Sequence, residues 1–190
     1  ISVPKNGIVG KTSPLNFPVI VKPRYGRGSK NIRLVNNEKS YKVSSLGYVW
    51  QEYLLPASQE YTCPVYRYNN ERYTTLIMRR KMEGGRTVSG VVVKNKYIEN
   101  YINKIARVIK LKGSINIQLR LTVNGPILFE INPRLSGTLV FRDIMGFTDL
   151  RWWVSDLFGL KSKIYKPPKI GTKFYLDSSE YIKYSLKETH

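Results

Sequence analysis

The sequence predicts an α+β fold, in which hairpins of antiparallel strands are mixed with a small number of helices. Short segments rich in β-branched and aromatic residues follow one another at hairpin spacing over residues 17–54 and 60–86. Residues 97–111 instead repeat apolar side chains at helical spacing, with lysines and asparagines on the other face. Strands and helices do not alternate regularly, which argues against a parallel, doubly wound sheet.

The amino-terminal part predicts a hairpin followed by further strands. Strands are expected at residues 19–22, 31–35, 48–54, 60–67 and 73–80. The first two flank a loop at residues 23–30 that contains Gly26 and Gly28. A short helix is expected at residues 38–46 and a glycine-containing loop at residues 82–86.

The carboxyl-terminal part begins with the predicted helix at residues 97–111, which Gly113 ends. Strands at residues 115–123 and 127–131 follow, and residues 139–160 contain a second helical stretch. Residues 161–169 (KSKIYKPPK) read as a connection that contains prolines.

Composition excludes several kinds of site. Cys63 is the only cysteine and His190 the only histidine, so an internal disulfide, a cysteine-rich zinc site and a Ser-His-Asp triad are excluded on this chain. No apolar run reaches the roughly 18 residues that a membrane span requires. We therefore expect a soluble, cytoplasmic protein.

The net charge of +19 comes from 32 lysines and arginines against 13 acids. Such a charge attracts phosphates, nucleic acids or acidic lipid surfaces. A solvated, lysine-rich surface explains it equally well, so the charge alone decides nothing.

The stretch FEINPRLSGT places Glu130 and Asn132 two residues apart on a strand, so their side chains share one face. Phe129 and Ile131 alternate with them and are expected on a core face. Arg134 follows just past the strand end, where a cation can bind phosphate oxygens.

The loop before this strand sets its expected register. A two-residue Asn-Gly turn would pair Val123 with Pro126, but proline cannot donate the hydrogen bond that closes such a turn. A three-residue loop at residues 124–126 pairs Val123 with Ile127 instead. That register sets Gln118 opposite Asn132 and Arg120 opposite Glu130, so that three oxygen-bearing side chains, those of Gln118, Glu130 and Asn132, converge.

Carboxylate and amide oxygens with room for water suit Mg²⁺, which takes its other ligands from substrate phosphates. We therefore predict a metal site at Gln118, Glu130 and Asn132. The alternative is an ordinary polar edge strand.

Lys22 ends an apolar strand just before the loop PRYGRGSK. Glycines let backbone amides approach phosphate closely, and the basic side chains add positive charge. The sequence is not a P-loop, and a basic hairpin turn is the alternative. Downstream, residues 51–54 (QEYL) can offer backbone groups to an adenine edge and Glu60 can accept from a ribose hydroxyl, although both Glu52 and Glu60 could equally be surface ion-pair partners.

The order of four motifs resembles the ATP-grasp superfamily over residues 17–146. The motifs are KPRYGRGS, QEYL with EYT shortly after, INIQ and FEINPRLSG. The chain is most similar to its carbamoyl-phosphate-synthase-like branch of carboxylate-amine ligases. The resemblance implies two α+β lobes, each with a mainly antiparallel sheet, which hold ATP in the cleft between them. The small lobe would be residues 1–55 and the large lobe residues 56–190.

The resemblance also implies roles for individual residues. Lys22 would bind ATP phosphates as a catalytic cation, and Arg134 would meet the γ-phosphate and the nascent acyl phosphate. The nucleotide would be held by Lys22, Gly26, Gly28, Ser29, Glu52, Tyr53, Leu54 and Glu60. Mg²⁺, for which Mn²⁺ can substitute, would lie at Gln118, Glu130 and Asn132. The acidic substrate would meet Arg79, Arg80, Lys81, Ser136 and Gly137.

The chain departs from the superfamily pattern in two respects. Relatives carry an amino-terminal α/β domain before the grasp lobes, so we expect a truncated enzyme with a missing domain or partner chain. Gln118 stands where many relatives have an acid, although the carbamoyl-phosphate-synthase branch uses glutamine. The expected partners are a small carboxylate and an amine.

Two other functions stay open. A nucleic-acid-binding module would account for the charge of +19 and for 14 tyrosines that could stack on bases. The basic residues are dispersed along the chain, however, which argues against a nucleic acid partner. The other is a nucleotide-binding remnant of the fold without catalysis.

Overall fold

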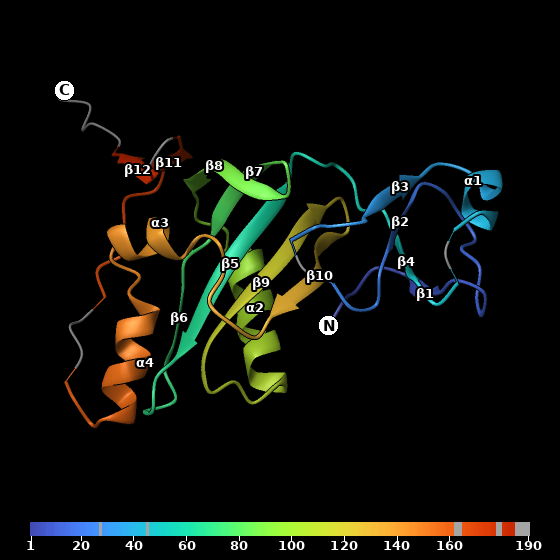
Figure 1. Ribbon diagram of the computed structural model, residues 1–190. Coiled ribbons are helices and arrows are strands. Elements are labelled where there is room, and N and C mark those ends of the chain that lie inside the picture. The colour runs from blue at the N-terminus through green and yellow to red at the C-terminus, as the bar shows by residue number, and fades with distance from the viewer. Residues whose placement is uncertain (27, 45, 162–164, 178–179, 185–190) are drawn as a thin grey trace.

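The computed structural model describes residues 1–26, 28–44, 46–161, 165–177 and 180–184. Within these ranges the strands form two separate antiparallel sheets, which lie toward opposite ends of the molecule in Figure 1. The α+β prediction is confirmed. None of the helices in these ranges has both the length and the apolar character needed to cross a membrane.

The smaller sheet is built from strands within residues 6–52. Its order is β1 (Asn6–Ile8), β4 (Val49–Glu52), β2 (Val19–Lys22) and β3 (Arg33–Val35). The predicted hairpin is confirmed, because β2 pairs with β3 and Val19 lies opposite Val35. The short helix α1 (Glu38–Lys42) begins at Asn37, whose side chain accepts a hydrogen bond from the Ser40 amide and so caps the helix. Apolar side chains from the sheet, from α1 and from Val9 form a small core of their own: Val9, Val19, Val21, Val35, Tyr41 and Trp50.

The larger sheet contains the remaining strands. Its order is β10 (Gly125–Asn132), β9 (Gly113–Thr122), β5 (Glu60–Arg67), β7 (Met78–Glu83), β8 (Arg86–Val92), β11 (Lys173–Leu176) and β12 (Glu180–Lys183), with β6 (Tyr73–Thr75) paired to β5. The strand predicted at residues 60–67 coincides with β5, whereas β1, β8, β11 and β12 were not predicted.

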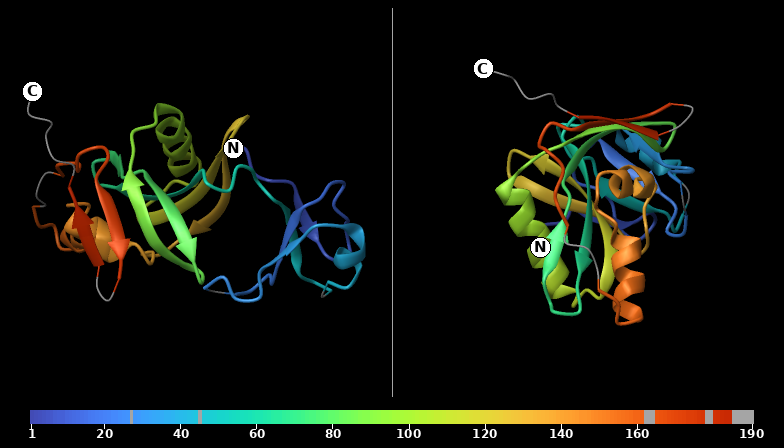
Figure 2. Two further views of the ribbon diagram at one scale, coloured as in Figure 1. Left: turned by 90° about the horizontal axis from the view of Figure 1, so that it is seen from above. Right: turned by 90° about the vertical axis from the view of Figure 1, so that its left-hand side faces the viewer.

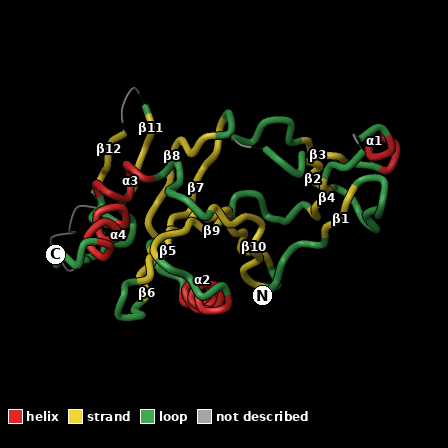
Figure 3. The backbone as a smooth tube through the Cα atoms, turned by 60° about the horizontal axis from the view of Figure 1, so that its bottom comes forward, coloured by secondary structure: helices red, strands yellow, loops and turns green. Residues whose placement is uncertain are grey.

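Helices cover both faces of the larger sheet. The helix α2 (Lys96–Val108) buries Ile98, Ile102 and Ile105 against odd-numbered residues of β5 and β9, as its periodicity predicts. On the opposite face, Tyr66 of β5 packs with Trp152 of α4 (Asp149–Leu157). The helix α3 (Leu139–Ile144) lies beside β12. Figure 2 shows α2 and α4 on opposite sides of the strands, and Figure 3 shows α3 and α4 near β11 and β12.

Three predicted elements need correction. The strand expected at residues 73–80 is interrupted, because β6 ends at Thr75 and β7 begins at Met78. The loop expected at residues 82–86 is present but shorter, since β7 continues to Glu83 and only Gly84 and Gly85, both with positive φ, form the turn into β8. The helical stretch at residues 139–160 is two helices with Gly146 at positive φ between them. The predicted connection at residues 161–169 falls partly outside the described residues.

The register expected between β9 and β10 is also wrong. The turn consists of Val123 and Asn124, so Thr122 pairs with Gly125 and Arg120 lies opposite Ile127. A bulge at Phe129 then shifts the register by one residue, which places Gln118 opposite Glu130 instead of Asn132. With the two-residue turn alone, Gln118 and Glu130 would point to opposite faces of the sheet. The bulge shifts the pairing by one residue, so that the two side chains share one face. The bulge also turns Phe129 onto this face, where it was expected on the core face.

Candidate active site

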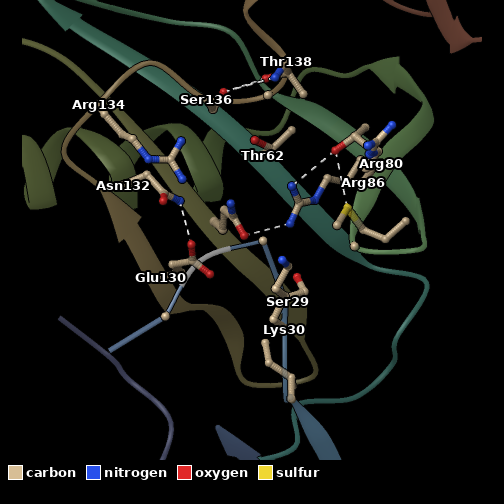
Figure 4. Close-up of a pocket in the computed structure, with 18 of the residues that line it drawn as sticks. Ser29, Lys30, Thr62, Arg80, Arg86, Glu130, Asn132, Arg134, Ser136 and Thr138 are labelled. Carbon is tan, nitrogen blue, oxygen red and sulfur yellow. Dashed lines mark hydrogen bonds between the residues drawn. The ribbon is translucent and has the colours of Figure 1, made fainter. Parts of the chain in front are cut away.

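A cleft of about 780 Å³ lies between the β2–β3 loop of the smaller sheet and the strands of the larger sheet. A second cavity of about 320 Å³ adjoins it and shares Lys22, Ser29 and Glu130 with it. The cleft is therefore built by segments far apart in the sequence, and Figure 4 shows side chains from both sides converging on it.

Most of the residues singled out from the sequence line these two cavities. They are Lys22, Gly26, Gly28, Ser29, Glu52, Tyr53, Leu54, Glu60, Arg80, Gln118, Glu130, Asn132, Arg134, Ser136 and Gly137. Arg79 and Lys81 do not line either cavity, because side chains alternate along β7 and both are exposed on the other side of the strand from Arg80.

Polar oxygens gather where β9 and β10 meet. Asn132 Nδ2 donates to Glu130 Oε1 at 2.8 Å, and Gln118 Oε1 accepts from Arg80 Nη2 at 2.7 Å. No group of three His, Cys, Asp or Glu side chains that could hold a metal occurs among the described residues. A cation here would therefore draw one carboxylate and amide oxygens from the protein and its remaining ligands from water or phosphate, a donor set that fits Mg²⁺.

Glu60 lies between two arginines. Its Oε1 accepts from Arg80 Nε at 3.0 Å and from Arg80 Nη2 at 2.8 Å, while its Oε2 accepts from Arg120 Nη2 at 2.5 Å. Both carboxylate oxygens are thus engaged, and Glu60 joins two strands of the sheet. The predicted register set Arg120 opposite Glu130 but gave it no role in the site, although its spacing of two from Gln118 places it on the same face.

Arg120 also organises the smaller cavity. Its Nη1 donates to the Leu54 carbonyl at 2.5 Å, and its guanidinium lies 5.3 Å from the Tyr53 ring centroid and 5.9 Å from that of Phe129. Further apolar side chains were missed by the sequence analysis: Ile20, Ile32, Met82 and Phe129. They come from both sheets and make an apolar slot beside the residues 51–54. The Glu52 carboxylate accepts from the Lys5 amide at 3.1 Å.

Lys22 lies at the boundary of the two cavities. Its Nζ donates to Gln51 Oε1 at 2.8 Å. Burial lowers the pKa of Lys22 from its usual value of 10.5, and the negative charge of Glu130 partly opposes that effect. An anion arriving in the cleft would favour the charged form and raise the pKa of this side chain.

The loop after β10 carries Arg134 and the Ser136–Thr138 pair. Arg134 Nη1 donates to the Leu135 carbonyl at 3.0 Å, and the hydroxyls of Ser136 and Thr138 are 2.9 Å apart. Ser136 Oγ also accepts from Arg142 Nη1 at 2.8 Å. Arg142 is fully buried and makes a two-point ion pair with Asp149, so the loop is anchored to the interior.

The glycine-containing loop is the β2–β3 loop, which contains Gly26 and Gly28, and it contacts the larger sheet at Gly85. A Cβ built on Gly85 would lie 3.1 Å from the Gly28 carbonyl oxygen and 3.3 Å from Ser29 Cβ. Gly28 and Ser29 both have positive φ. This contact brings the β2–β3 loop against the β7–β8 turn over the cleft.

Solved structures share this fold. N5-carboxyaminoimidazole ribonucleotide synthetase from Thermus thermophilus matches with a TM-score of 0.73 at 13% identity, over 92% of this chain and 52% of that one. The synthetase from Staphylococcus aureus complexed with ADP matches with a TM-score of 0.71 at 19% identity, over 92% and 52%. The biotin carboxylase domain of Hydrogenobacter thermophilus 2-oxoglutarate carboxylase, in complex with MgADP, ADP and bicarbonate, matches with a TM-score of 0.71 at 12% identity, over 92% and 46%. The chain spans about half the length of these structures.

These likenesses show that the two sheets and the cleft between them form the same fold as in the solved structures. The match of an ATP-grasp family model to the chain confirms the superfamily predicted from the sequence. The chain belongs to the family described as ATP-grasp in the biosynthetic pathway with Ter operon, whose model matches residues 48–174. Its resemblance to the carbamoyl-phosphate-synthase branch stays a prediction.

Proposed function

We propose that this chain is the ATP-binding and catalytic part of a Mg²⁺-dependent ligase that activates a carboxylate as an acyl phosphate for attack by an amine. The observation that carries the proposal is the convergence of Lys22, Glu130 and Arg134 on one cleft between two sheets. Solved structures of the same fold are complexes with ADP or MgADP. In this proposal the two sheets belong to the two lobes, residues 1–55 and 56–190.

The nucleotide would divide between the two cavities. The smaller one offers apolar walls and the backbone of residues 51–54 to an adenine, while the larger one offers Lys22 and the glycine-containing loop to phosphates. Glu60 would then meet the ribose from a position already fixed by two arginines.

Glu130, Asn132 and Gln118 would hold Mg²⁺, which supplies positive charge against the phosphate oxygens when bound. Gln118 Oε1 would have to exchange its hydrogen bond from Arg80 for the metal. Mn²⁺, with similar oxygen ligands, would be an alternative occupant.

The reaction would proceed in two displacements. A carboxylate oxygen attacks the γ-phosphorus of ATP, the bond to the bridging oxygen breaks, and ADP leaves with that electron pair. The amine then attacks the acyl carbon, inorganic phosphate leaves, and the amine nitrogen loses a proton. Arg134 lines the cleft and would stabilise charge on the transferred phosphoryl group.

Hydroxylamine provides a test that does not require the natural amine, because it converts an acyl phosphate into a hydroxamate. We expect the full chain, with ATP, Mg²⁺, hydroxylamine and a panel of small carboxylates, to form hydroxamate and ADP in equal amounts. Binding of ATP without hydroxamate or ADP would identify a non-catalytic remnant. Absence of ATP binding, with steeply salt-dependent affinity for DNA or RNA, would identify a nucleic-acid-binding module.

A further inference from the structure

The part of the cleft that the smaller cavity does not share has a distinct lining. Four hydroxyl groups face this part, and they come from three separate segments: Thr62 of β5, Thr87 of β8, and Ser136 and Thr138 of the loop after β10. Two guanidinium groups, those of Arg86 and Arg134, accompany the hydroxyls. Figure 4 shows Arg86 and Arg134 on opposite sides of the cavity in that view, with Thr62 between them.

The charges that line the whole cleft do not balance. Among the described residues the cationic ones are Lys22, Arg24, Lys30, Arg80, Arg86 and Arg134, and Glu130 is the one acid. Arg80 already pairs with Glu60 at 2.8 Å, a carboxylate that it shares with Arg120. In the proposed function, Lys22, Arg24 and Lys30 lie on the side of the triphosphate, and Arg134 serves the transferred phosphoryl group. Arg86 is left over.

Arg86 is the first residue of β8 and follows directly after the Gly84–Gly85 turn. Within residues 1–26, 28–44, 46–161, 165–177 and 180–184, its guanidinium has no hydrogen-bond or ion-pair partner. Its neighbour Thr87 is held in place, because Thr87 Oγ1 accepts from Arg80 Nη1 at 3.4 Å. Phe141 and Leu176 add apolar surface to the same lining.

We propose that Arg86 and the hydroxyl groups form a subsite for a second anionic group on the acceptor, so that the substrate carries a carboxylate or phosphate besides the carboxylate that is activated. This inference rests on the proposed function, because it takes Arg134 as the residue at the reacting end. Guanidinium binds carboxylate and phosphate through paired hydrogen bonds. The Ser136 and Thr138 hydroxyls bond each other and retain one proton for such an anion, whereas Thr62 already donates to Asn116 Oδ1 and serves as a polar wall. A neutral or singly charged acceptor would leave Arg86 without a counter-charge.

Binding to the full chain saturated with MgADP tests the subsite without requiring turnover. The probes are succinate, which has two carboxylates, 3-phosphoglycerate, which has a carboxylate and a phosphate, and butyrate, which has one carboxylate. We expect one or both dianions to bind at least about tenfold more tightly than butyrate, a difference of about 1.4 kcal/mol. Whichever dianion binds more tightly identifies the second group.

Two variants separate the subsite from general electrostatics. Arg86→Gln should remove the advantage of the dianions over butyrate while leaving the affinity for MgADP unchanged. Arg107→Gln removes the same charge from an exposed position at the end of α2 and should leave the advantage intact. Three results would overturn the proposal. Butyrate binds as tightly as the dianions, neither dianion binds measurably, or both variants lose the advantage of the dianions equally. If dianion binding depends on Arg86 but no hydroxamate forms, the result counts against the proposed function and not against the subsite.

Discussion

The two adjoining cavities differ in how their charges are compensated. The smaller cavity is lined by three cations, Lys22, Arg80 and Arg120, and by three carboxylates, Glu52, Glu60 and Glu130. The cleft beside it is lined, within the described residues, by six cations and the single carboxylate of Glu130. One cavity is therefore neutral as built, whereas the other has an excess of positive charge.

This difference indicates which parts of the site are organised before a ligand arrives. In the smaller cavity, Glu60 fixes Arg80 and Arg120 through hydrogen bonds of 2.5 to 3.0 Å, so the apolar slot has rigid polar edges. In the cleft, Arg86 and Lys30 have no such partners among the described side chains. Both residues are exposed, so their charges are solvated in the free protein and can attract an anionic ligand.

Removing the central acid of the smaller cavity should have the largest effect on stability. In Glu60→Gln, the side chains of Arg80 and Arg120, which are 7% and 10% exposed, would face each other without a counter-charge. We expect the free energy of unfolding in urea to fall by about 3 kcal/mol, as for other buried ion pairs that lose one partner. The matched control is Glu71→Gln, because the Glu71 carboxylate also pairs with an arginine, Arg67, but is 78% exposed. This variant should lower the free energy of unfolding by less than about 1 kcal/mol. Equal losses would show that the network adds no stability.

The corresponding change in the cleft should affect ligand binding instead of stability. Glu130→Gln removes the one acid among the described residues that line the cleft and retains an oxygen that can accept from Asn132 Nδ2. We expect at least about a tenfold loss of Mg²⁺-dependent ATP affinity, measured by calorimetry with and without EDTA, while unfolding in urea is unchanged. Glu83→Gln removes an exposed acid that pairs with Lys81 and should alter neither quantity. Unchanged ATP affinity in Glu130→Gln would refute the metal role.

Sequence patterns predicted the elements whose side chains follow one clear period. The helix α2 was predicted because its apolar residues repeat toward one core, and the strand β5 because it is a short run of apolar and β-forming residues that is buried on both faces. The strand β8 was missed because it pairs on both sides without apolar alternation and contains Gly90, whose hydrogen is packed against the Phe174 ring. Its pairing partner β11 lies more than eighty residues away, which no local pattern reveals.

The site shows the same limit. Lys22 and Glu130 were singled out from motifs, but the charges that neutralise Arg80 depend on strand neighbours that the sequence does not specify. The convergence of Gln118 with Glu130 was predicted for the wrong reason. The turn is shorter than expected, and a bulge at Phe129 returns the two side chains to the same face of the sheet. A bulge leaves no signal in a single sequence, because the same residues also read as a regular strand.

The contact between the glycine-containing loop and the β7–β8 turn bounds both cavities and should have a smaller effect when disturbed. In Gly85→Ala, the new methyl group would meet the Gly28 carbonyl oxygen at 3.1 Å, and in Gly84→Ala nothing lies within 4 Å. Both glycines have positive φ, so both variants should lose about 1 kcal/mol of stability. Only Gly85→Ala should also weaken ATP binding, by about threefold, since it displaces the loop over the phosphates. Identical ATP affinities in the two variants would show that this contact does not shape the site.

The smallest expected effect is a pH dependence that arises where the two cavities meet. Burial lowers the pKa of Lys22 below 10.5 in the free protein, whereas a bound triphosphate would favour the charged form and raise that pKa. Between the two values, ATP binding takes up a proton, so ATP affinity falls as pH rises through the lowered pKa and is constant below it. One proton allows at most about a tenfold change per pH unit. Titrations of ATP from pH 7 to pH 10 should show this fall in the wild-type chain and a flatter profile in Lys22→Arg, because a guanidinium stays charged over the whole range. Parallel profiles in the two proteins would assign the pH dependence to another group and would place Lys22 outside the phosphate site.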